Sequence, residues 1–268
     1  MAKVYETKGR PSFNPLIVHC ASLEQAQEVI DFDHCGHRQA TKFWPGALTL
    51  VLVRKDGSTV SELAGAGLST LAVRIPAHPL IREVIEILGE PIVAPSANPS
   101  GKLSPTRADH VLEAFGGKVP VLDGGPCEAG IESTIISLTK SRPTLLRPGA
   151  IPAEEIQAVL GHPLAQPGGG IEAPGMLASH YAPEAKLRLD AEAADDGELL
   201  LGFGGTTSAA LDLSPTGDLR EAAAHLFDYL RKLDAQADRL AVASIPEKGL
   251  GVGINDRLRR AAAPRDES

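Results

Sequence analysis

The chain has 268 residues, of which 43% are hydrophobic, enough for one large domain or two smaller domains that each bury a core. This excludes a small disulfide-stapled scaffold and a disordered tail. The 26 Lys and Arg residues against 34 Asp and Glu give a net charge of −8. A chain of this charge repels polyanions as a whole, which argues against duplex nucleic acid as its main ligand and confines anion binding to local cationic sites.

The cysteines are few and widely spaced. Cys20, Cys35 and Cys127 are odd in number and form no disulfide framework, which is typical of a reducing compartment. No apolar run reaches the length that crosses a bilayer, and the N-terminal residues lack the apolar core of a signal peptide. We expect a cytoplasmic protein without membrane contact.

Short β-branched apolar runs alternate with helical patterns through the first part of the chain. In chain order we expect a strand at 16–20, a helix at 23–32, strands at 48–53 and 70–75, a helix at 79–88, a strand at 91–95, a helix at 103–115 and strands at 119–122, 134–138 and 144–146. Ser22 is placed to cap the first of these helices. The pattern predicts a mixed α/β domain with a sheet of at least five strands.

A stretch rich in Gly and Pro, residues 161–173, has no periodicity and is typical of a linker. We place a first domain at 1–160, the linker at 161–184 and a second domain at 185–268. Strands at 186–189, 198–203 and 239–243 alternate there with helices at 218–235 and 253–262. This predicts a small doubly wound, Rossmann-like α/β domain.

Two cations near the N-terminus, Lys8 and Arg10, flank Gly9, which lets the chain turn sharply. Lys offers a mobile point charge and Arg a planar fork, so the pair is able to bracket a phosphate. The alternative is a solvated basic tail, and for an isolated pair of cations that alternative is the more frequent outcome.

Two loops at strand ends carry polar groups. Ser96 and Asn98 directly follow the strand at 91–95, and Ser104 follows at the start of a helix, where anions are favoured. A second glycine-bearing loop at 124–134 precedes a strand, and Arg147 closes the next one. Ordinary turn and capping chemistry explains the same residues equally well.

Arg74 and His19 each end an apolar run. A substrate carboxylate and a structural salt bridge are both suitable partners for Arg74, and a histidine in this position is more often a satisfied core residue. The cluster at 34–37 has no second ligand pair at zinc-finger spacing, and Cys127 has no nearby base, so we expect neither a metal site nor a cysteine nucleophile. Cations and hydroxyls without an acid/base dyad are typical of nucleotidyl or phosphoryl transfer, in which alignment and charge neutralisation supply most of the rate.

Six segments in order carry a resemblance to a known family: KGRPSFNPLIVH, FWPGALTLVL, LAVRIPAHP, PIVAPSANPSGKLSPT, LDGGPCEAGIESTI and LLRPGAI. They resemble the YrdC-type domain of L-threonylcarbamoyladenylate synthases. The later segments APGMLASHYAP and GLGVGINDRLRRAA resemble the two-domain form of that enzyme. The resemblance therefore extends over almost the whole chain.

The resemblance implies that L-threonine, bicarbonate and ATP form threonylcarbamoyl-AMP and pyrophosphate. ATP is the nucleotide substrate, and Mg²⁺ neutralises its polyphosphate. The product serves the threonylcarbamoylation of adenosine 37 in transfer RNA through a downstream tRNA-modifying transferase complex. Direct tRNA binding is left open.

The resemblance also implies two sets of site residues. The ATP-contacting positions are Lys8, Arg10, Asn14, Thr70, Ser96, Asn98, Ser104, Arg147 and Tyr181, the last in a linker that closes over the nucleotide. The threonine pocket comprises His19, Arg74, Ala94 and either Ser133 or Thr134, with Arg74 as the partner of the amino-acid carboxylate. No residue is assigned as a catalytic acid or base.

The family begins with a strand and a turn of the Pro-Thr-Glu-Thr-Val-Tyr-Gly type, followed by a helix. Only residues 2–7 correspond to the end of that helix, so the resemblance implies a chain truncated at its N-terminus that binds threonine poorly. Two alternatives follow. One is a nucleotide- or RNA-binding module without turnover, and the other is a relative that forms a carbamoyl-adenylate with a different acceptor.

Overall fold

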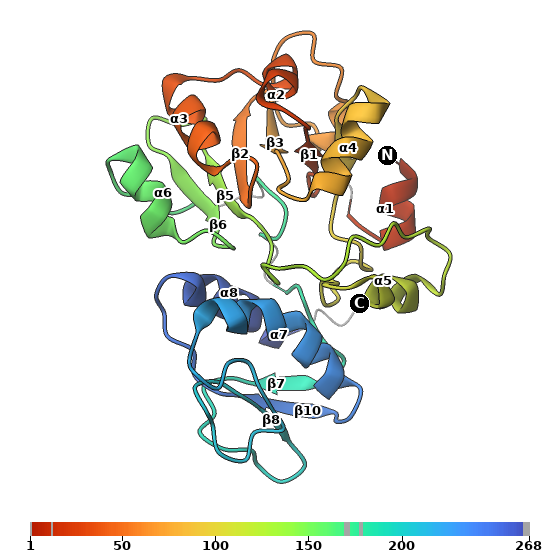
Figure 1. Ribbon diagram of the computed structural model, residues 1–268, viewed down its shortest axis with the longest axis vertical. Coiled ribbons are helices and arrows are strands. Elements are labelled where there is room, and N and C mark those ends of the chain that lie inside the picture. The colour runs from red at the N-terminus through yellow and green to blue at the C-terminus, as the bar shows by residue number, and fades with distance from the viewer. Residues whose placement is uncertain (1, 12, 169–171, 177–178, 265–268) are drawn as a thin grey trace. The chain divides into compact units, whose positions relative to one another are not determined.

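The computed structural model describes residues 2–11, 13–168, 172–176 and 179–264, and it divides into two compact units (Figure 1). Unit 1 consists of Met1–Pro95 and Glu132–Met176, and unit 2 of Ser96–Ile131 and Leu177–Ser268. Each unit contains its own sheet. The mixed α/β fold class expected from the sequence is confirmed.

Unit 1 is built on a six-stranded mixed sheet in the order β4-β1-β3-β2-β5-β6. Strand β1 is parallel to β3 and β2 to β5, while the pairs β1–β4, β2–β3 and β5–β6 are antiparallel. The elements of unit 1 are α1 Ala2–Lys8, β1 Ile17–His19, α2 Leu23–Val29, α3 His34–Phe43, β2 Leu48–Val53, the 3-10 helix η1 Glu62–Ala64, β3 Thr70–Arg74, α4 Pro79–Leu88, β4 Ile92–Ala94, β5 Thr134–Ser137, β6 Thr144–Arg147 and α6 Ala153–Leu160.

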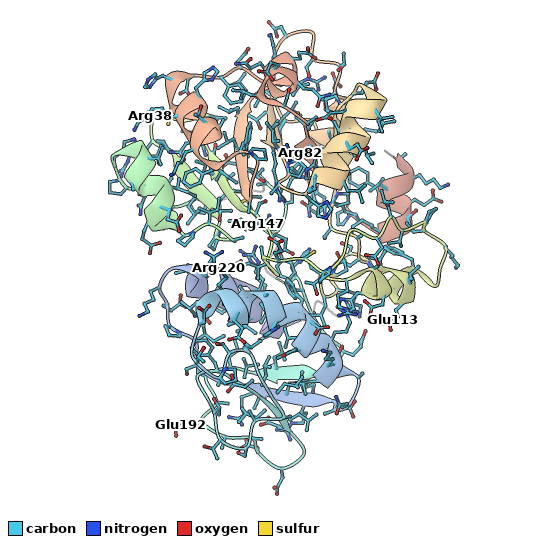
Figure 2. All side chains as sticks on the ribbon, in the orientation of Figure 1. Arg38, Arg82, Glu113, Arg147, Glu192 and Arg220 are labelled. Carbon is cyan, nitrogen blue, oxygen red and sulfur yellow. The ribbon has the colours of Figure 1, made fainter. Side chains whose placement is uncertain are left out.

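One face of this sheet is covered by helices. The apolar core there combines alternate strand residues with side chains from α2, α3 and α6: Val18, Leu48, Leu50, Leu52, Leu71, Val73, Ile136, Ala26, Val29, Ala40, Ile156 and Leu160. Helices α3 and α6 lie side by side (Figure 1). The guanidinium of Arg38 on α3 donates a hydrogen bond to the carbonyl of Val159 on α6. Figure 2 labels Arg38.

The opposite face carries the other half of the strand residues. Ile17, Val51, Ala72, Ile135 and Leu146 form a smaller cluster there with Ala173 and Met176. This division follows from the pleat of a strand, which sends successive side chains to opposite faces. Thr49, Arg74 and Ser133, which are described below, lie on this second face.

Unit 2 contains a parallel four-stranded sheet in the order β7-β10-β8-β9. Asp218 caps α7 by accepting hydrogen bonds from the backbone of Arg220 and Glu221 at 2.7 and 2.9 Å. Helices α7 and α8 contact one another. The elements are α5 Ala108–Phe115, β7 Lys186–Arg188, β8 Leu199–Gly202, β9 Leu211–Asp212, α7 Leu219–Asp234, β10 Arg239–Val242 and α8 Leu250–Ala262.

Residues 96–131 belong to unit 2 although two strands of the unit 1 sheet flank them in the sequence. His110 on α5 and Asp228 on α7 form a largely buried contact of 3.3 Å. Arg231 on α7 donates a hydrogen bond to the carbonyl of Leu103 at 3.1 Å. The segment is therefore held by side chains of the C-terminal part of the chain.

Several expected elements differ from the structure. Residues 119–122 form no strand, because Pro120 cannot donate to a ladder and Leu122 is 68% exposed. The helix expected at 103–115 begins only at Ala108, after an irregular segment. The sequence analysis missed four elements: α3, η1, α6 and β9. Of the expected linker, residues 169–171 and 177–178 lie outside the described residues.

All three cysteines have free thiols. No helix in the described part of the chain combines the length and the apolar character needed to cross a membrane.

Substitution of Gly130 tests how closely the segment 96–131 packs on α7. A Cβ atom at Gly130 would lie 2.0 Å from the carbonyl oxygen of Ala223 and 2.4 Å from the Cα of Ala224, both backbone atoms. Gly116 also has a positive φ, but no atom lies within 4 Å of a Cβ there. Gly116→Ala should therefore cost only about 1–2 kcal/mol for the left-handed conformation. Gly130→Ala should cost about 1–3 kcal/mol more, because it also overpacks the contact.

Urea unfolding followed by circular dichroism measures both variants. Equal losses in the free energy of unfolding would contradict the close approach of Gly130 to α7.

Candidate functional site

A row of polar side chains crosses the second face of the unit 1 sheet. His19 at the end of β1 pairs in register with Arg74 at the end of β3. Thr49 on β2 precedes Leu50, which pairs with Val73, so Thr49 lies beside Arg74 in the next strand. The Nε of Arg74 donates to the carbonyl of Gly46 at 2.8 Å, which anchors the guanidinium at this end of the sheet.

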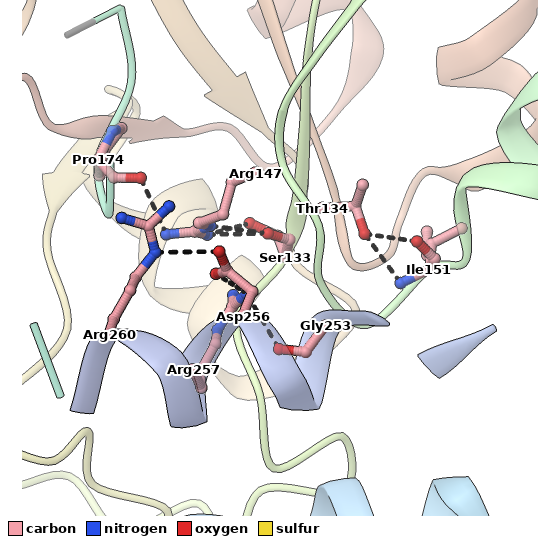
Figure 3. A network of polar contacts seen from close by, with 9 residues as sticks. All are labelled: Ser133, Thr134, Arg147, Ile151, Pro174, Gly253, Asp256, Arg257 and Arg260. Atoms are coloured by element: carbon pink, nitrogen blue, oxygen red, sulfur yellow. Dashed lines mark hydrogen bonds and ion pairs between the residues drawn. The ribbon is translucent and has the colours of Figure 1, made fainter. Parts of the chain in front are cut away.

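Ser133 and Arg147 extend this row at the ends of β5 and β6 (Figure 3). Arg147 is 4% exposed, and its Nη2 donates to the carbonyl of Ser133 at 2.8 Å and to its hydroxyl at 3.1 Å. The Nη1 of Arg147 donates to the carbonyl of Pro174 at 3.2 Å. The Oγ of Ser133 lies 2.7 Å from the Oγ1 of Thr49. A buried guanidinium, two hydroxyls and Arg74 are thus gathered at one end of the face.

Ser133 and Thr134 point to opposite faces of the sheet. Thr134 is followed by Ile135, which belongs to the second face, whereas Ile136 belongs to the helix-covered core. The hydroxyl of Thr134 donates to the carbonyl of Ile151 at 2.6 Å and accepts from its amide at 3.0 Å (Figure 3). The structure therefore brings Ser133, but not the hydroxyl of Thr134, to the polar row.

The N-terminal cations form a buried corner. Helix α1 ends in a Schellman motif: Gly9 adopts a φ of 61°, its amide donates to Glu6, and the amide of Arg10 donates to Tyr5 at 2.9 Å. Lys8 and Arg10 are only 7% and 8% exposed. The reversal at Gly9 turns both cations inward, so the solvated basic tail is excluded.

Electrostatics at this corner favour an anion. Burial and the neighbouring Arg10 lower the pKa of Lys8 to about 7. The guanidinium of Arg10 donates to the carbonyls of Asn14 and Pro15 at 3.3 and 2.8 Å, which fixes its direction. Asn14 is 1% exposed, and neither polar atom of its side chain has a partner among the described residues. An unsatisfied buried amide beside two cations is suited to bind a polar, anionic ligand.

The corner and the polar row lie toward opposite ends of the strands. Thr70 begins β3, whereas Arg74 ends it, and four residues of strand span about 13 Å. Ala94 pairs with Ile17, at the end of β1 that follows Asn14. The structure therefore groups Asn14, Thr70 and Ala94 toward one end of the sheet, and His19, Arg74, Ser133 and Arg147 toward the other.

His19 pairs in register with Arg74 in the polar row, and its imidazole is hydrogen-bonded to the backbone of Ala94 in the neighbouring strand. Burial and the charge of Arg74 lower the pKa of His19 to about 4, although a hydrogen bond to the backbone of Ala94 acts in the opposite direction. The ring is therefore neutral at physiological pH. A neutral imidazole that donates to a carbonyl keeps its other nitrogen as an acceptor.

The remaining candidates lie in unit 2. The side-chain amide of Asn98 donates to the carbonyls of Pro99 and Lys102 at 2.9 and 2.8 Å, which stabilises the loop. Ser104 is buried and Ser96 partly buried.

Tyr181 is buried within the same unit. It is 1% exposed, and its φ of 61° is rare for an aromatic residue. Its ring centroid lies 5.5 Å from the ring of Phe227 and 5.5 Å from the guanidinium carbon of the fully buried Arg257. The next amide, that of Ala182, donates to the carbonyl of Gly101 at 2.8 Å, so this segment is paired with the loop that contains Asn98.

In two glycine-bearing loops, backbone amides donate hydrogen bonds to carboxylates of the same chain. The amide of Gly125 donates to the carboxylate of Asp123 at 2.8 Å. The amides of Gly205 and Thr206 donate to the carboxylate of Asp212 at 3.0 and 2.9 Å. These amides therefore stabilise turns.

Comparisons with known proteins identify the family of this chain. A family model described as "Telomere recombination" matches residues 1–149, and one described as "Threonylcarbamoyl-AMP synthase, C-terminal domain" matches residues 151–263. The threonylcarbamoyl-AMP synthases of Pyrococcus abyssi and Bacillus subtilis are 40% and 38% identical over 289 residues, which cover 98% of this chain and 84% and 83% of theirs. The synthase of Schizosaccharomyces pombe is 33% identical over 97% of this chain and 79% of its own.

A solved structure also matches. The crystal structure of P. abyssi Sua5 complexed with L-threonine has a TM-score of 0.88 and 38% sequence identity, over 97% of this chain and 84% of that one. The fold and the comparisons define a two-unit α/β protein whose first part is of the YrdC type. The chain belongs to the threonylcarbamoyl-AMP synthase family.

Thr49 is the residue of the polar row that the sequence analysis missed. A threonine inside the apolar run 48–53 is an ordinary strand former, so nothing in the sequence distinguishes it. Only the register of β2 with its neighbours brings it to Ser133.

The lowered pKa of Lys8 predicts pH-dependent anion binding at the corner. An anion favours the protonated amine, and the unliganded amine loses its proton as the pH rises through about 7. The quantity to measure is the ratio of two affinities for inorganic tripolyphosphate, that of the native chain divided by that of Lys8→Met. This ratio should fall by up to about tenfold between about pH 6 and 8. Titration calorimetry measures this ratio.

The control is Lys3→Met, which removes an exposed cation from the same helix and should keep the native pH dependence. A ratio that does not change with pH would show that Lys8 is not the titrating group.

Proposed function

We propose that this chain synthesises L-threonylcarbamoyl-AMP from L-threonine, bicarbonate and ATP, with release of pyrophosphate. The observation that carries the proposal is the polar row on the second face of the unit 1 sheet, where Arg74 and the Ser133–Arg147 pair interrupt an otherwise apolar surface. Membership of the threonylcarbamoyl-AMP synthase family supports it.

Threonine binds at the end of the face where β1 and β3 finish. Arg74 faces the substrate carboxylate, because a guanidinium held through its Nε keeps its outer nitrogens in a fixed orientation. Ser133 fits this pocket better than Thr134, whose hydroxyl is already bonded to Ile151. One ring nitrogen of His19 is hydrogen-bonded to the backbone of Ala94, which orients the ring. The second ring nitrogen accepts a hydrogen bond from the bound threonine.

ATP is the second substrate. Lys8 and Arg10 bind the polyphosphate, and the unsatisfied amide of Asn14 and the hydroxyl of Thr70 bind polar groups of the nucleotide. Arg147 is the ATP-contacting residue that we assign to the polar row, where its positive charge favours an anionic ligand. The ATP-contacting residues that we assign to unit 2 are Ser96, Asn98, Ser104 and Tyr181.

We propose that Mg²⁺ enters with ATP. Among the residues that the structure describes, no group of three or more His, Cys, Asp or Glu side chains lies together to hold a metal ion. Mg²⁺ commonly keeps several waters and binds through substrate phosphates, so phosphate oxygens and water supply its ligands here. Bound in this way, the ion would help to neutralise the charge of the polyphosphate.

The chemistry requires alignment more than proton transfer. The threonine amine reacts with bicarbonate-derived CO₂ once it is deprotonated, and the carbamate oxygen then attacks the α-phosphorus in line with pyrophosphate. With a pKa of about 4, His19 is too weak a base to hold the amine proton and acts as a hydrogen-bond acceptor. The chain contributes position and positive charge. We further propose that the product serves threonylcarbamoylation of adenosine 37 in tRNA through a downstream transferase complex.

Pyrophosphate release from ATP and bicarbonate, measured with and without threonine, tests the function. The proposal predicts release that depends on threonine. Release without threonine would point to another acceptor, and ATP binding without release would point to a nucleotide-binding module.

Arg74 provides a sharper test of the threonine pocket. Arg74→Lys and Arg74→Gln each remove a charge-assisted, fork-shaped contact to a carboxylate. The threonine KM should rise about 10- to 100-fold in both variants, while the KM for ATP stays within about threefold of the native value. Steady-state pyrophosphate release measures both constants.

The control is Arg142→Gln, which removes an exposed arginine of the same unit and should leave both constants unchanged. Equal increases in the two KM values for the Arg74 variants would exclude a specific role toward threonine.

A further inference from the structure

Thr49 places a hydroxyl inside the apolar strand β2. The side chain is 0% exposed, and its neighbours Leu48 and Leu50 point into the helix-covered core. A buried hydroxyl costs free energy unless it is hydrogen-bonded, so its partner must be identified. That partner is the Oγ of Ser133 at 2.7 Å.

Ser133 is held from three directions. Arg147 donates to both its carbonyl and its hydroxyl. A Cβ atom on Gly149 would lie 2.5 Å from the carbonyl carbon of Ser133, so the chain after Arg147 packs directly on the Ser133 backbone. Thr49 then contacts the hydroxyl itself. The position of the Ser133 side chain is therefore set by its neighbours before any ligand binds.

The hydroxyl protons of Ser133 and Thr49 are not both used by hydrogen bonds within the pair. A guanidinium only donates, so the Ser133 oxygen accepts from Arg147. The two hydroxyls of Ser133 and Thr49 carry one proton each, and their mutual hydrogen bond uses one of the two. The other proton has no acceptor among the residues that the structure describes. The pair retains one buried donor beside two arginines.

We propose that Thr49 is a positioning residue for threonine binding: it donates its proton to Ser133, and Ser133 then donates its own proton to an oxygen of the bound amino acid. With Arg147 and Thr49 both donating, the Ser133 oxygen has used both lone pairs, which directs its O–H away from them. Arg74 lies in the same row and binds the same ligand. The inference rests on the proposed function, because it concerns the same threonine pocket.

Thr49→Val tests the hydroxyl, since valine keeps the β-branched shape. Loss of this hydrogen bond should raise the threonine KM and Kd about three- to tenfold, while kcat and the KM for ATP stay within about twofold. Thr49→Ser restores the hydroxyl and should return the threonine constants to within about twofold of native. If Thr49→Val folds poorly, Thr49→Ala against Thr49→Ser isolates the hydroxyl, because both variants lack the methyl group.

Thr139→Val is the matched control. The hydroxyls of Thr139 and Ser137 form a second Thr–Ser pair in unit 1, with an O–O distance of 2.9 Å, at the other end of β5. Removing this threonine hydroxyl should leave the threonine constants unchanged.

The double variant Thr49→Val/Ser133→Ala shows whether Thr49 acts through Ser133. Its threonine KM should equal that of Ser133→Ala alone. Additive effects, or an unchanged threonine KM in Thr49→Val while Ser133→Ala is impaired, would overturn the inference and leave the proposed function standing. A native chain without threonine-dependent pyrophosphate release would overturn the proposed function instead. Calorimetric threonine binding that Thr49→Val weakens would then still support the role of Thr49.

Discussion

The two-residue period of the strands is the constraint on which unit 1 depends. Alternate side chains of one six-stranded sheet supply a helix-covered apolar core on one face and the polar row on the other. A shift of register by one residue would bury Arg74 among the helices and expose Val73. The hydrophobic core that stabilises unit 1 therefore also determines where its charged and hydroxyl groups lie.

Backbone carbonyls anchor three arginines of unit 1 that belong to the candidate site. Arg10 donates to Asn14 and Pro15, Arg74 to Gly46 and Arg147 to Ser133. Each of these carbonyls fixes the direction of a guanidinium. Under the proposed function, these anchors orient the arginines for a carboxylate and a polyphosphate before either binds, which reduces the cost of ordering on binding.

Sequence patterns predicted most strands of both sheets, because apolar, β-branched runs carry a strong signal. They missed α3, whose helix begins with the polar segment His34–His37, and the two-residue β9. They placed a strand at 119–122 because it is a short apolar run with two valines, yet a strand needs a neighbour with which to pair. Among the site residues, Lys8, Arg10 and Arg74 could be proposed from local sequence. Thr49 could not, and the choice between Ser133 and Thr134 depends on a pleat that only the folded sheet defines.

The central claim is that the second face of the unit 1 sheet binds threonine. A crystal structure of this chain grown with L-threonine tests it most directly. The account predicts that the amino acid lies on this face, with its carboxylate within hydrogen-bond distance of the guanidinium of Arg74 and one of its oxygens at the hydroxyl of Ser133. Threonine bound elsewhere, or bound on this face without contact to Arg74 and Ser133, would contradict it.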